Sequence, residues 1–316
     1  MPDINLITIL GPTASGKTLL GAHLAYHLNG EIISADSRQV YKKMNIGTGK
    51  DYDDYIVYGK KIAYHLVDMH NPGYKYNVYE YQRDFIKAYS QISGRGKLPL
   101  LVGGSGMYIQ AVLDNYQLIR VPVNTLLRNR LKNKSQDELV SILKSYHTDL
   151  HNTTDLLQRK RTIRAIEIAD HYKQHPKITY DYPDLRTLIF GLEYDRQSIR
   201  KRITKRLHTR LQSGMIEEVA ELLKSVNSKD LIFYGLEYKL ITFYLQGELT
   251  YEEMIFQLEI AIHQFAKRQV TWFRRMERSG FKIHWINGQS SLEYKLENIY
   301  TIIKSNDKQL IKRWKK

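Results

Sequence analysis

The sequence of 316 residues contains no cysteine. This absence excludes disulfide bonds, zinc sites with cysteine ligands and catalysis by a thiol, and it fits the reducing cytoplasm. No apolar run reaches the roughly 18 residues that a membrane-spanning helix needs. The N-terminus also lacks the charged and then apolar segments of a secretory leader. We therefore expect a cytoplasmic protein that does not enter a membrane.

The sequence also lacks internal repeats and low-complexity linkers, and it has fewer acidic than basic residues. Lys and Arg number 48 against 33 Asp and Glu, which gives a net charge of +15. Residues 1–120 carry 13 basic and 10 acidic groups, so most of the excess lies in residues 121–316. Such a basic segment is typical of proteins that bind nucleic acid and less often of those that bind anionic membranes. A surface that merely increases solubility is the alternative.

Residues 11–18, Gly-Pro-Thr-Ala-Ser-Gly-Lys-Thr, form a complete phosphate-binding motif, called the phosphate loop below. The apolar run Leu6–Leu10 before it predicts a buried strand, and Lys17–Leu28 has the apolar spacing of a helix. A glycine-rich turn into a helix N-terminus directs backbone N–H groups at one point, which suits a di- or triphosphate. Lys17 would reach phosphate oxygens, and the Thr18 hydroxyl would bind Mg²⁺. The expected diphosphate-binding residues are Gly11, Thr13, Ala14, Ser15, Gly16, Lys17 and Thr18.

Further strands and helices alternate along the first third of the chain. Glu31–Asp36 and Leu98–Val102 are predicted strands, Tyr79–Ile92 is a predicted helix, and residues 37–60 are predicted to be loop with short helical turns. The chain from about residue 126 is mostly helical, except for the apolar run Thr187–Leu192 and two weaker strand candidates, at residues 62–67 and 282–286. This alternation predicts an α/β fold with a doubly wound parallel sheet.

From this pattern, residues 1–120 would form the core around the phosphate loop, completed by parts of 185–316, and the residues after 120 would be basic and mostly helical.

Asp36 ends the second predicted strand, at the sheet edge where open parallel sheets bind their ligands. An Asp in such a cleft is suited to act as a general base. A helix N-cap or an ion pair with Arg38 is the alternative. ATP-hydrolysing motors usually have an acid after a long apolar strand, but Leu98–Val102 runs into Gly103 and Gly104. This difference argues against an ATPase.

Five blocks of the sequence carry a more specific signal. They are residues 11–18, residues 33–41 with 46–50, residues 101–108, residues 161–167 and residues 266–274. In this order they resemble the signature of the bacterial type of tRNA dimethylallyltransferase (tRNA isopentenyltransferase, the IPP transferase family). The resemblance implies a P-loop NTPase-like fold and a monomer that uses Mg²⁺. It further implies that residues 121–160 form a small helical insert and residues 161–316 a basic, mostly helical portion, both of which bind tRNA. It also implies transfer of a dimethylallyl group from dimethylallyl diphosphate to N6 of the adenosine 3′ adjacent to the anticodon in tRNA, with release of diphosphate.

The resemblance also implies roles for single residues. Asp36 would accept the N6 proton, Arg206 would assist at the diphosphate, and Ser105 would replace the usual Thr beside the reacting centre. Arg202 and Arg210 lie one helical turn on either side of Arg206, so the identity of the diphosphate-binding arginine stays open. The expected tRNA-binding residues are Asp36, Ser37, Arg38, Gln39, Arg161, Arg164, Lys267, Arg268, Gln269, Thr271, Trp272 and Arg274.

Trp272 shares a predicted helix face with Arg268 and Arg275, which suits stacking on an unpaired base; packing in a helical core is the alternative. The sequence departs from the family in places. Gly49 stands where the family usually has Ala, the stretch 234–244 is two residues longer than usual, and residues 113–159 match poorly.

Other functions remain open from the sequence. A phosphate-loop kinase for a small molecule can also use an Asp after the second strand, but it does not need a basic C-terminal portion. An isopentenyltransferase that acts on free adenine nucleotide is a closer alternative, and the same basic portion favours tRNA as the acceptor. A non-catalytic RNA-binding protein would not need Lys17, Thr18 and Asp36 together.

Overall fold

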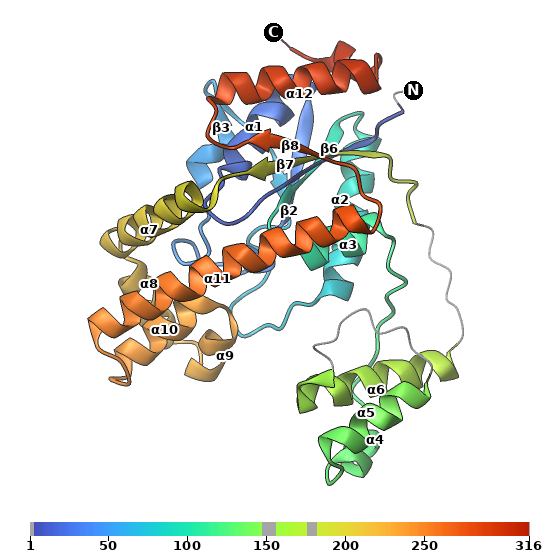
Figure 1. The fold of residues 1–316 in the computed structure, drawn as a ribbon, viewed down its shortest axis with the longest axis vertical. Coiled ribbons are helices and arrows are strands. Elements are labelled where there is room, and N and C mark those ends of the chain that lie inside the picture. The colour runs from blue at the N-terminus through green and yellow to red at the C-terminus, as the bar shows by residue number, and fades with distance from the viewer. Residues whose placement is uncertain (1–2, 147–155, 176–181, 316) are drawn as a thin grey trace. The chain divides into compact units, whose positions relative to one another are not determined.

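A computed structural model describes residues 3–146, 156–175 and 182–315 (Figure 1). Its centre is a six-stranded parallel sheet in the order β5-β2-β6-β1-β7-β8. The strands are β1 (Leu6–Leu10), β2 (Gly30–Ala35), β5 (Tyr64–His65), β6 (Leu98–Gly103), β7 (Thr187–Glu193) and β8 (Ile283–Asn287). The predicted α/β fold is confirmed, including the return of Thr187–Leu192 to the sheet beside β1.

The helices that pack around this sheet account for most of the remaining chain. They are α1 (Lys17–Leu28), α2 (Val78–Gly94), α3 (Gly106–Leu113), α7 (Arg196–Gln212), α8 (Met215–Leu223), α9 (Ser228–Phe233), α10 (Leu236–Leu245), α11 (Tyr251–Arg278) and α12 (Leu292–Asn306). Two short 3₁₀ segments, η1 (Tyr52–Tyr55) and η3 (Leu310–Arg313), complete them. The predicted helix over 79–92 is confirmed as α2, whose N-terminus is fixed by a capping box between Asn77 and Glu80.

A small antiparallel hairpin, β3 (Ile56–Val57) with β4 (Lys60–Lys61), lies within the segment that the sequence predicted as loop. Its two turn residues, Tyr58 and Gly59, both have positive φ angles, 48° and 73°. This is the backbone of a two-residue turn that matches the twist of paired strands. The hairpin was missed because Tyr rarely occupies such a position, so the sequence carries little sign of it.

The two faces of the sheet bury separate apolar clusters. In β1, Leu6 and Leu10 belong to the cluster that includes residues of α2, α3 and α11. Ile7 and Ile9 belong to the other cluster, which includes residues of α1 and α12. Because β1 is buried on both faces, the point at which it ends and the phosphate loop begins is fixed by packing from two sides.

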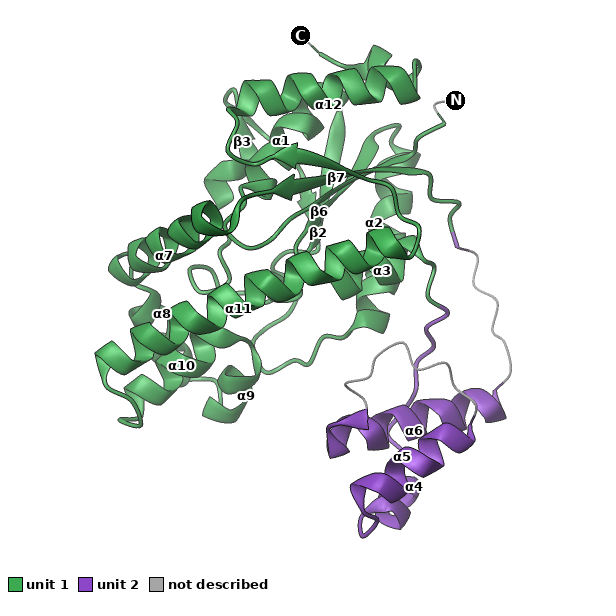
Figure 2. Cartoon of the chain, in the orientation of Figure 1, with its two compact units in different colours: residues 1–116, 183–316 green, residues 117–182 purple. Residues whose placement is uncertain are grey.

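The chain divides into two compact units (Figure 2). Residues 1–116 and 183–316 form the first unit, and residues 117–182 form the second. The second unit contains α4 (Thr125–Leu131), α5 (Gln136–Ser145) and α6 (Arg159–Gln174), held by a cluster that includes Leu139, Leu143 and Ile166. It extends beyond the expected insert of residues 121–160, because α6 packs on α5. Residues 147–155 of that insert lie outside the described residues.

Within the part of the chain that the structure describes, no helix has the length and apolar character needed to span a membrane.

A buried carboxylate at one end of the sheet is held by two cationic side chains and a histidine. Glu31 in β2 accepts from Arg95 Nη2 and His65 Nε2, both at 2.7 Å, and lies 3.0 Å from Lys97 Nζ. Burial alone would raise its pKa, but the hydrogen bonds from His65, Lys97 and Arg95 lower the pKa of Glu31 to about 2. The ionised form therefore stabilises the folded protein.

We predict that Glu31→Gln lowers the free energy of unfolding at pH 7 by about 1–3 kcal/mol, a range that allows for the partial exposure of Arg95 and Lys97. Because the pKa of Glu31 is lower in the folded protein than in the unfolded chain, its contribution is present above the unfolded value near 4.5 and lost as the pH falls toward 2. Urea denaturation should show the difference from wild type narrowing between about pH 5 and pH 2.

The control for this prediction is Glu221→Gln, which changes an exposed carboxylate paired only with the exposed Lys224. It should alter the stability by less than about 0.5 kcal/mol at any pH. A Glu31→Gln protein as stable as wild type at pH 7 would contradict the conclusion that the ionised Glu31 carboxylate stabilises the folded protein.

Candidate active site

The phosphate loop has a backbone conformation that leaves the start of α1 open to a ligand. Gly16 is the N-cap residue of α1, with a φ of 80°, and it makes no side-chain cap. Ala14 also has a positive φ, 61°. The N–H groups of the first helical turn are therefore not capped by this residue, as expected for a helix that binds an anion at its N-terminus.

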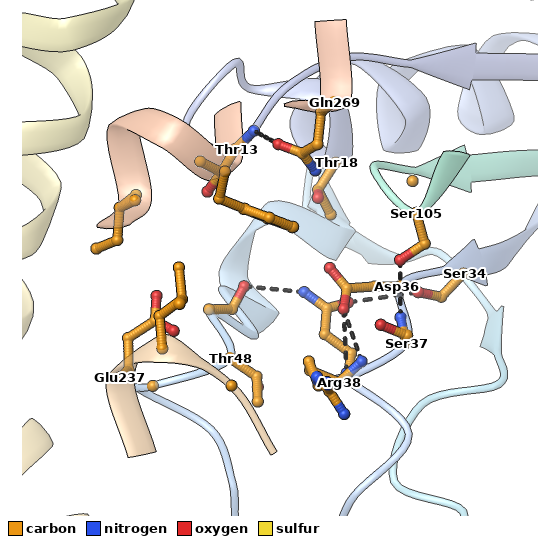
Figure 3. Close-up of a pocket in the computed structure, with 18 of the residues that line it drawn as sticks. Thr13, Thr18, Ser34, Asp36, Ser37, Arg38, Thr48, Ser105, Glu237 and Gln269 are labelled. Atoms are coloured by element: carbon orange, nitrogen blue, oxygen red, sulfur yellow. Dashed lines mark hydrogen bonds between the residues drawn. The ribbon is translucent and has the colours of Figure 1, made fainter. Parts of the chain in front are cut away.

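Three side chains from distant parts of the sequence hold the phosphate loop in this conformation. The Thr13 N–H donates to Oε1 of Gln269 at 2.8 Å (Figure 3). Arg202 Nε donates to the Ala14 carbonyl, and the Tyr194 hydroxyl donates to the Ser15 carbonyl, both at 2.9 Å. Because these bonds come from α7, α11 and the segment after β7, the loop is fixed before any ligand binds.

A cavity of about 290 Å³ lies beside the phosphate loop (Figure 3). It brings together many of the residues that the sequence analysis selected: Thr13, Lys17, Thr18, Asp36, Ser37, Arg38, Gln39, Ser105, Arg206, Arg268 and Gln269. Residues from the phosphate loop, the ends of β2 and β6, α7 and α11 thus meet at one place, at the carboxyl edge of the sheet, as expected for an open parallel sheet.

Asp36 is fixed in the cavity by the turn that follows β2. Its Oδ1 atom accepts the N–H groups of Arg38 at 2.9 Å and Gln39 at 3.4 Å. The next residue, Ser37, donates its N–H to Oγ of Ser105 at 3.1 Å. Ser105 therefore couples the turn after β2 to the turn after β6, and its hydroxyl helps to position the segment that carries Asp36.

Gly103 explains why no acid follows the strand β6. A Cβ atom at this position would overlap the carbonyl oxygen of Ala35 in β2. Only glycine lets the two strands lie this close at their carboxyl ends, so the acidic residue of ATP-hydrolysing motors does not fit here.

Basic side chains dominate one side of the cavity. Lys17 is partly buried; desolvation lowers its pKa to about 8, with the positive charges of Arg206 and Arg210 acting in the same direction and Asp36 opposing them. Arg206 forms an ion pair with Asp51. Of the three arginines left open by the sequence, Arg206 and Arg210 line this cavity, whereas Arg202 binds a phosphate-loop carbonyl.

Several expected tRNA-binding residues lie outside the cavity lining. Trp272 packs against Gly106 and donates its indole N–H to Gln110 at 2.9 Å. Arg274 forms ion pairs with Glu193 and Glu277. Lys267 and Thr271 are exposed on α11. Contacts of these residues with tRNA stay predictions, and for Trp272 and Arg274 the structure provides partners within the protein.

The two arginines of α6 belong to the second unit and are described within it alone. Arg161 is exposed. Arg164 donates to the buried Glu167 at 3.0 Å and to the Val121 carbonyl at 2.8 Å. These bonds give Arg164 a structural role in the unit, and its contact with tRNA stays a prediction.

Residues of α8 and α10 also shape the cavity, although the sequence analysis did not identify them. Glu218 accepts the N–H groups of residues 45, 46 and 47, at 2.8, 2.8 and 3.1 Å, and the hydroxyl of Tyr238 at 2.7 Å. Glu237 lines the cavity, and burial raises the pKa of its carboxyl. The glycines at 47 and 49 marked the loop that Glu218 binds, but no motif marked Glu218, Glu237 or Tyr238 themselves.

Gln269 uses both ends of its amide inside the protein. Besides accepting from Thr13, its Nε2 donates to the Gly104 carbonyl at 2.9 Å, and the side chain is buried. It therefore links α11 to the phosphate loop and to the turn after β6. These contacts favour a positioning role over the expected contact with tRNA.

We predict that Gln269→Leu lowers the free energy of unfolding by about 1–3 kcal/mol, because it leaves the Thr13 N–H and the Gly104 carbonyl without this partner. Urea denaturation measures the change, and titration with inorganic diphosphate should show weaker binding. Gln264→Leu, at an exposed position of the same helix, is the matched control and should change neither quantity. A Gln269→Leu protein as stable as wild type would show that the link is not needed.

Comparisons with known proteins agree with this geometry. Residues 39–276 match the family model described as IPP transferase. A protein of Bacteroides fragilis named tRNA dimethylallyltransferase 2 is 56% identical over 94% of this chain and 97% of its own length. A protein of Phocaeicola vulgatus with the same name is 54% identical over 96% and 99%.

The fold has a solved counterpart as well. The full-length tRNA isopentenylpyrophosphate transferase of Bacillus halodurans superposes with a TM-score of 0.69 and is 29% identical, over 98% of this chain and 97% of that chain. The family match covers well over half of the chain, and the two relatives are similar over 97% and 99% of their own lengths. The chain therefore belongs to the IPP transferase family.

Proposed function

We propose that this protein transfers a dimethylallyl group from dimethylallyl diphosphate to N6 of the adenosine 3′ adjacent to the anticodon in tRNA. The observation that carries the proposal is the cavity itself, in which Lys17, Thr18 and Arg206 meet Asp36. The first three suit a departing diphosphate, and Asp36 suits the removal of a proton from the attacking amine.

The reaction exchanges one bond for another. The N6 nitrogen forms a bond to the allylic carbon, the bond from that carbon to the diphosphate oxygen breaks, and diphosphate leaves with the electron pair. The amine proton passes to a carboxylate oxygen of Asp36. The Oδ1 atom of this carboxylate already accepts the N–H groups of the turn after β2. An adenine amine is a weak nucleophile, so the departure of diphosphate carries most of the barrier.

Negative charge therefore grows on the diphosphate in the transition state. The phosphate-loop N–H groups, Lys17 and Arg206 would stabilise it there. Since diphosphate is anionic, its binding favours the charged form of Lys17, whose pKa in the free protein is about 8.

Magnesium fits this site as an ion held mainly by the substrate. Among the described residues, no group of three or more acidic or histidine side chains could hold a metal ion. The Thr18 hydroxyl lines the cavity and would contribute one oxygen ligand, as Mg²⁺ with a diphosphate requires few protein ligands. When bound, the ion would neutralise charge on the leaving diphosphate.

The molecule that accepts the dimethylallyl group distinguishes the proposed enzyme from the alternatives, a small-molecule kinase and an isopentenyltransferase that acts on free adenine nucleotide. Two relatives more than 50% identical over nearly their whole length are named tRNA dimethylallyltransferase, which supports tRNA over a free adenine nucleotide or a kinase substrate. The excess of basic over acidic residues in 121–316 supports the same acceptor. An adenosine turned out of its stack would enter the cavity, where the bound substrates would shield the reacting carbon from water. We further propose that the protein acts as a monomer in the cytoplasm.

We predict that Asp36→Asn lowers the rate of prenyl transfer by about 10²–10⁴-fold, the usual contribution of a general base. Asparagine keeps an oxygen that can accept the N–H groups of Arg38 and Gln39, so tRNA and donor should bind within about threefold of wild type. Single-turnover transfer of labelled dimethylallyl to tRNA measures the rate, and filter binding measures the affinity for tRNA.

The matched control is Asp53→Asn, which removes an exposed carboxylate from η1 and should leave the rate within about twofold. Full transfer activity in Asp36→Asn would show that Asp36 is not the base.

A further inference from the structure

Arg210 is a cationic side chain of the cavity whose Nη2 atom lacks a hydrogen-bond partner among the described residues. It lines the cavity from α7, one turn after Arg206. Its Nη2 atom is buried and, among the described residues, makes no hydrogen bond. The ion pair that Nη2 forms with Oδ1 of Asp51 is 4.0 Å long, which is beyond hydrogen-bond distance. A buried guanidinium N–H without an acceptor is costly, so this atom is available to an anion that enters the cavity.

Gly49 creates the space that this guanidinium occupies. A Cβ atom on Gly49 would overlap Nη2 of Arg210 and would lie 2.9 Å from Nη2 of Arg206. The φ angle of Gly49, 71°, also disfavours any other residue. The family usually has alanine at this position, and an alanine here would displace Arg210. The glycine of this chain therefore allows Arg210 to occupy its present place.

The loop that contains Gly49 cannot easily move away from the arginine. Glu218 holds its backbone at residues 45–47, and the Gly49 carbonyl accepts from Nε2 of Gln39 at 3.1 Å. With the loop anchored at both points, an added methyl group at position 49 would push the Arg210 side chain out of its present place.

The charges around Arg210 also suit the binding of an anion. Burial, with a smaller effect of the nearby Arg206, lowers the pKa of Arg210 to about 10, so the side chain remains charged at neutral pH. Lys17 and Arg206 face the same cavity, and the acids nearest to Arg210 are Asp51 and Glu237. Burial raises the pKa of the Glu237 carboxyl, and the half-exposed Asp51 lies within 4.0 Å of both arginines as their shared counter-ion. A ligand with several negative charges would complete this arrangement.

We propose that Arg210 is a second guanidinium that binds the diphosphate of the prenyl donor, in exchange for its long contact with Asp51, and that Gly49 permits it to do so. The inference rests on the proposed function for the identity of the donor, but the diphosphate group itself can be tested alone. Arg206 and Arg210 would then hold diphosphate oxygens from one helix face, opposite Lys17.

The test is calorimetric titration of the full chain with inorganic diphosphate and, separately, dimethylallyl diphosphate, each with Mg²⁺. Arg210→Met should weaken the binding of both by about tenfold to a hundredfold, the range for a lost charge-assisted hydrogen bond. Its thermal midpoint should stay the same or rise, because the variant removes a buried charge that lacks a close partner. Arg210→Lys should recover only part of the affinity, since it restores the charge without the planar fork.

Gly49→Ala provides the second arm. Alone it should weaken diphosphate binding, because the methyl group displaces Arg210. Combined with Arg210→Met it should weaken binding little further, so the two changes should be strongly non-additive. Should Gly49→Ala fail to fold, the Arg210 variants alone still decide the question.

Arg200→Met is the matched control, because it removes a positive charge from an exposed position of the same helix. It should leave diphosphate binding unchanged. Arg210→Met with wild-type diphosphate affinity would overturn the inference even if the wild-type protein prenylates tRNA. Conversely, Arg210-dependent diphosphate binding in a wild-type protein that does not prenylate tRNA would uphold the anion site and refute the proposed reaction, so the two failures can be told apart.

Discussion

Gathering several cations in one partly desolvated cavity costs free energy. Contacts elsewhere in the folded protein compensate for that cost. Lys17, Arg206 and Arg210 face the same space. Arg206 and Arg210 lower the pKa of Lys17, and Arg206 lowers the pKa of Arg210. Such a group of like charges persists only if the backbone that carries it is held by other contacts. The free energy stored in this repulsion is released when a polyanion binds, which couples substrate binding to the relief of an unfavourable arrangement.

The contacts that hold the cavity come from every layer of the first unit. Packing on both faces of β1 fixes the start of the phosphate loop, and Gln269 ties that loop to α11 and to the turn after β6. Ser105 joins the turns that follow β2 and β6, so Asp36 is placed relative to the same frame. On the far side Glu218 fixes the backbone of residues 45–47. The residues that line the cavity are thus positioned by hydrogen bonds to backbone more than by contacts with one another.

Local sequence signals predicted the parts of this site that are contiguous in the chain. The phosphate loop, β1 and α1 follow from a glycine motif between two periodic segments, and Asp36 follows from its place at the end of β2. The roles of Glu218, Tyr238 and Gln269 in positioning the cavity could not be predicted this way. Glu218 and Gln269 act on backbone groups more than 160 residues away, and Tyr238 acts through Glu218. Only the folded chain brings the distant pairs together.

Other differences between the predictions from the sequence and the structure also have physical causes. The hairpin of β3 and β4 turns on a tyrosine with positive φ, which sequence propensity disfavours. The extent of the second unit was underestimated because the charged start of α6 resembled a basic surface, while its apolar contribution, Ile166 and Ala169, is small. The resemblance to a known family favoured Arg206 and left Arg202 and Arg210 open as alternatives, because the position of Arg210 depends on the absence of a side chain at Gly49.

The most direct test of the account is the transfer of labelled dimethylallyl from its diphosphate, with Mg²⁺, to unmodified tRNA or an anticodon stem-loop with adenosine after the anticodon. AMP, and ATP with a nucleoside, would be offered in parallel as competing substrates. The account predicts label on N6 of that adenosine in the tRNA and none on AMP. Absence of label on tRNA, or movement of phosphate from ATP instead, would contradict it.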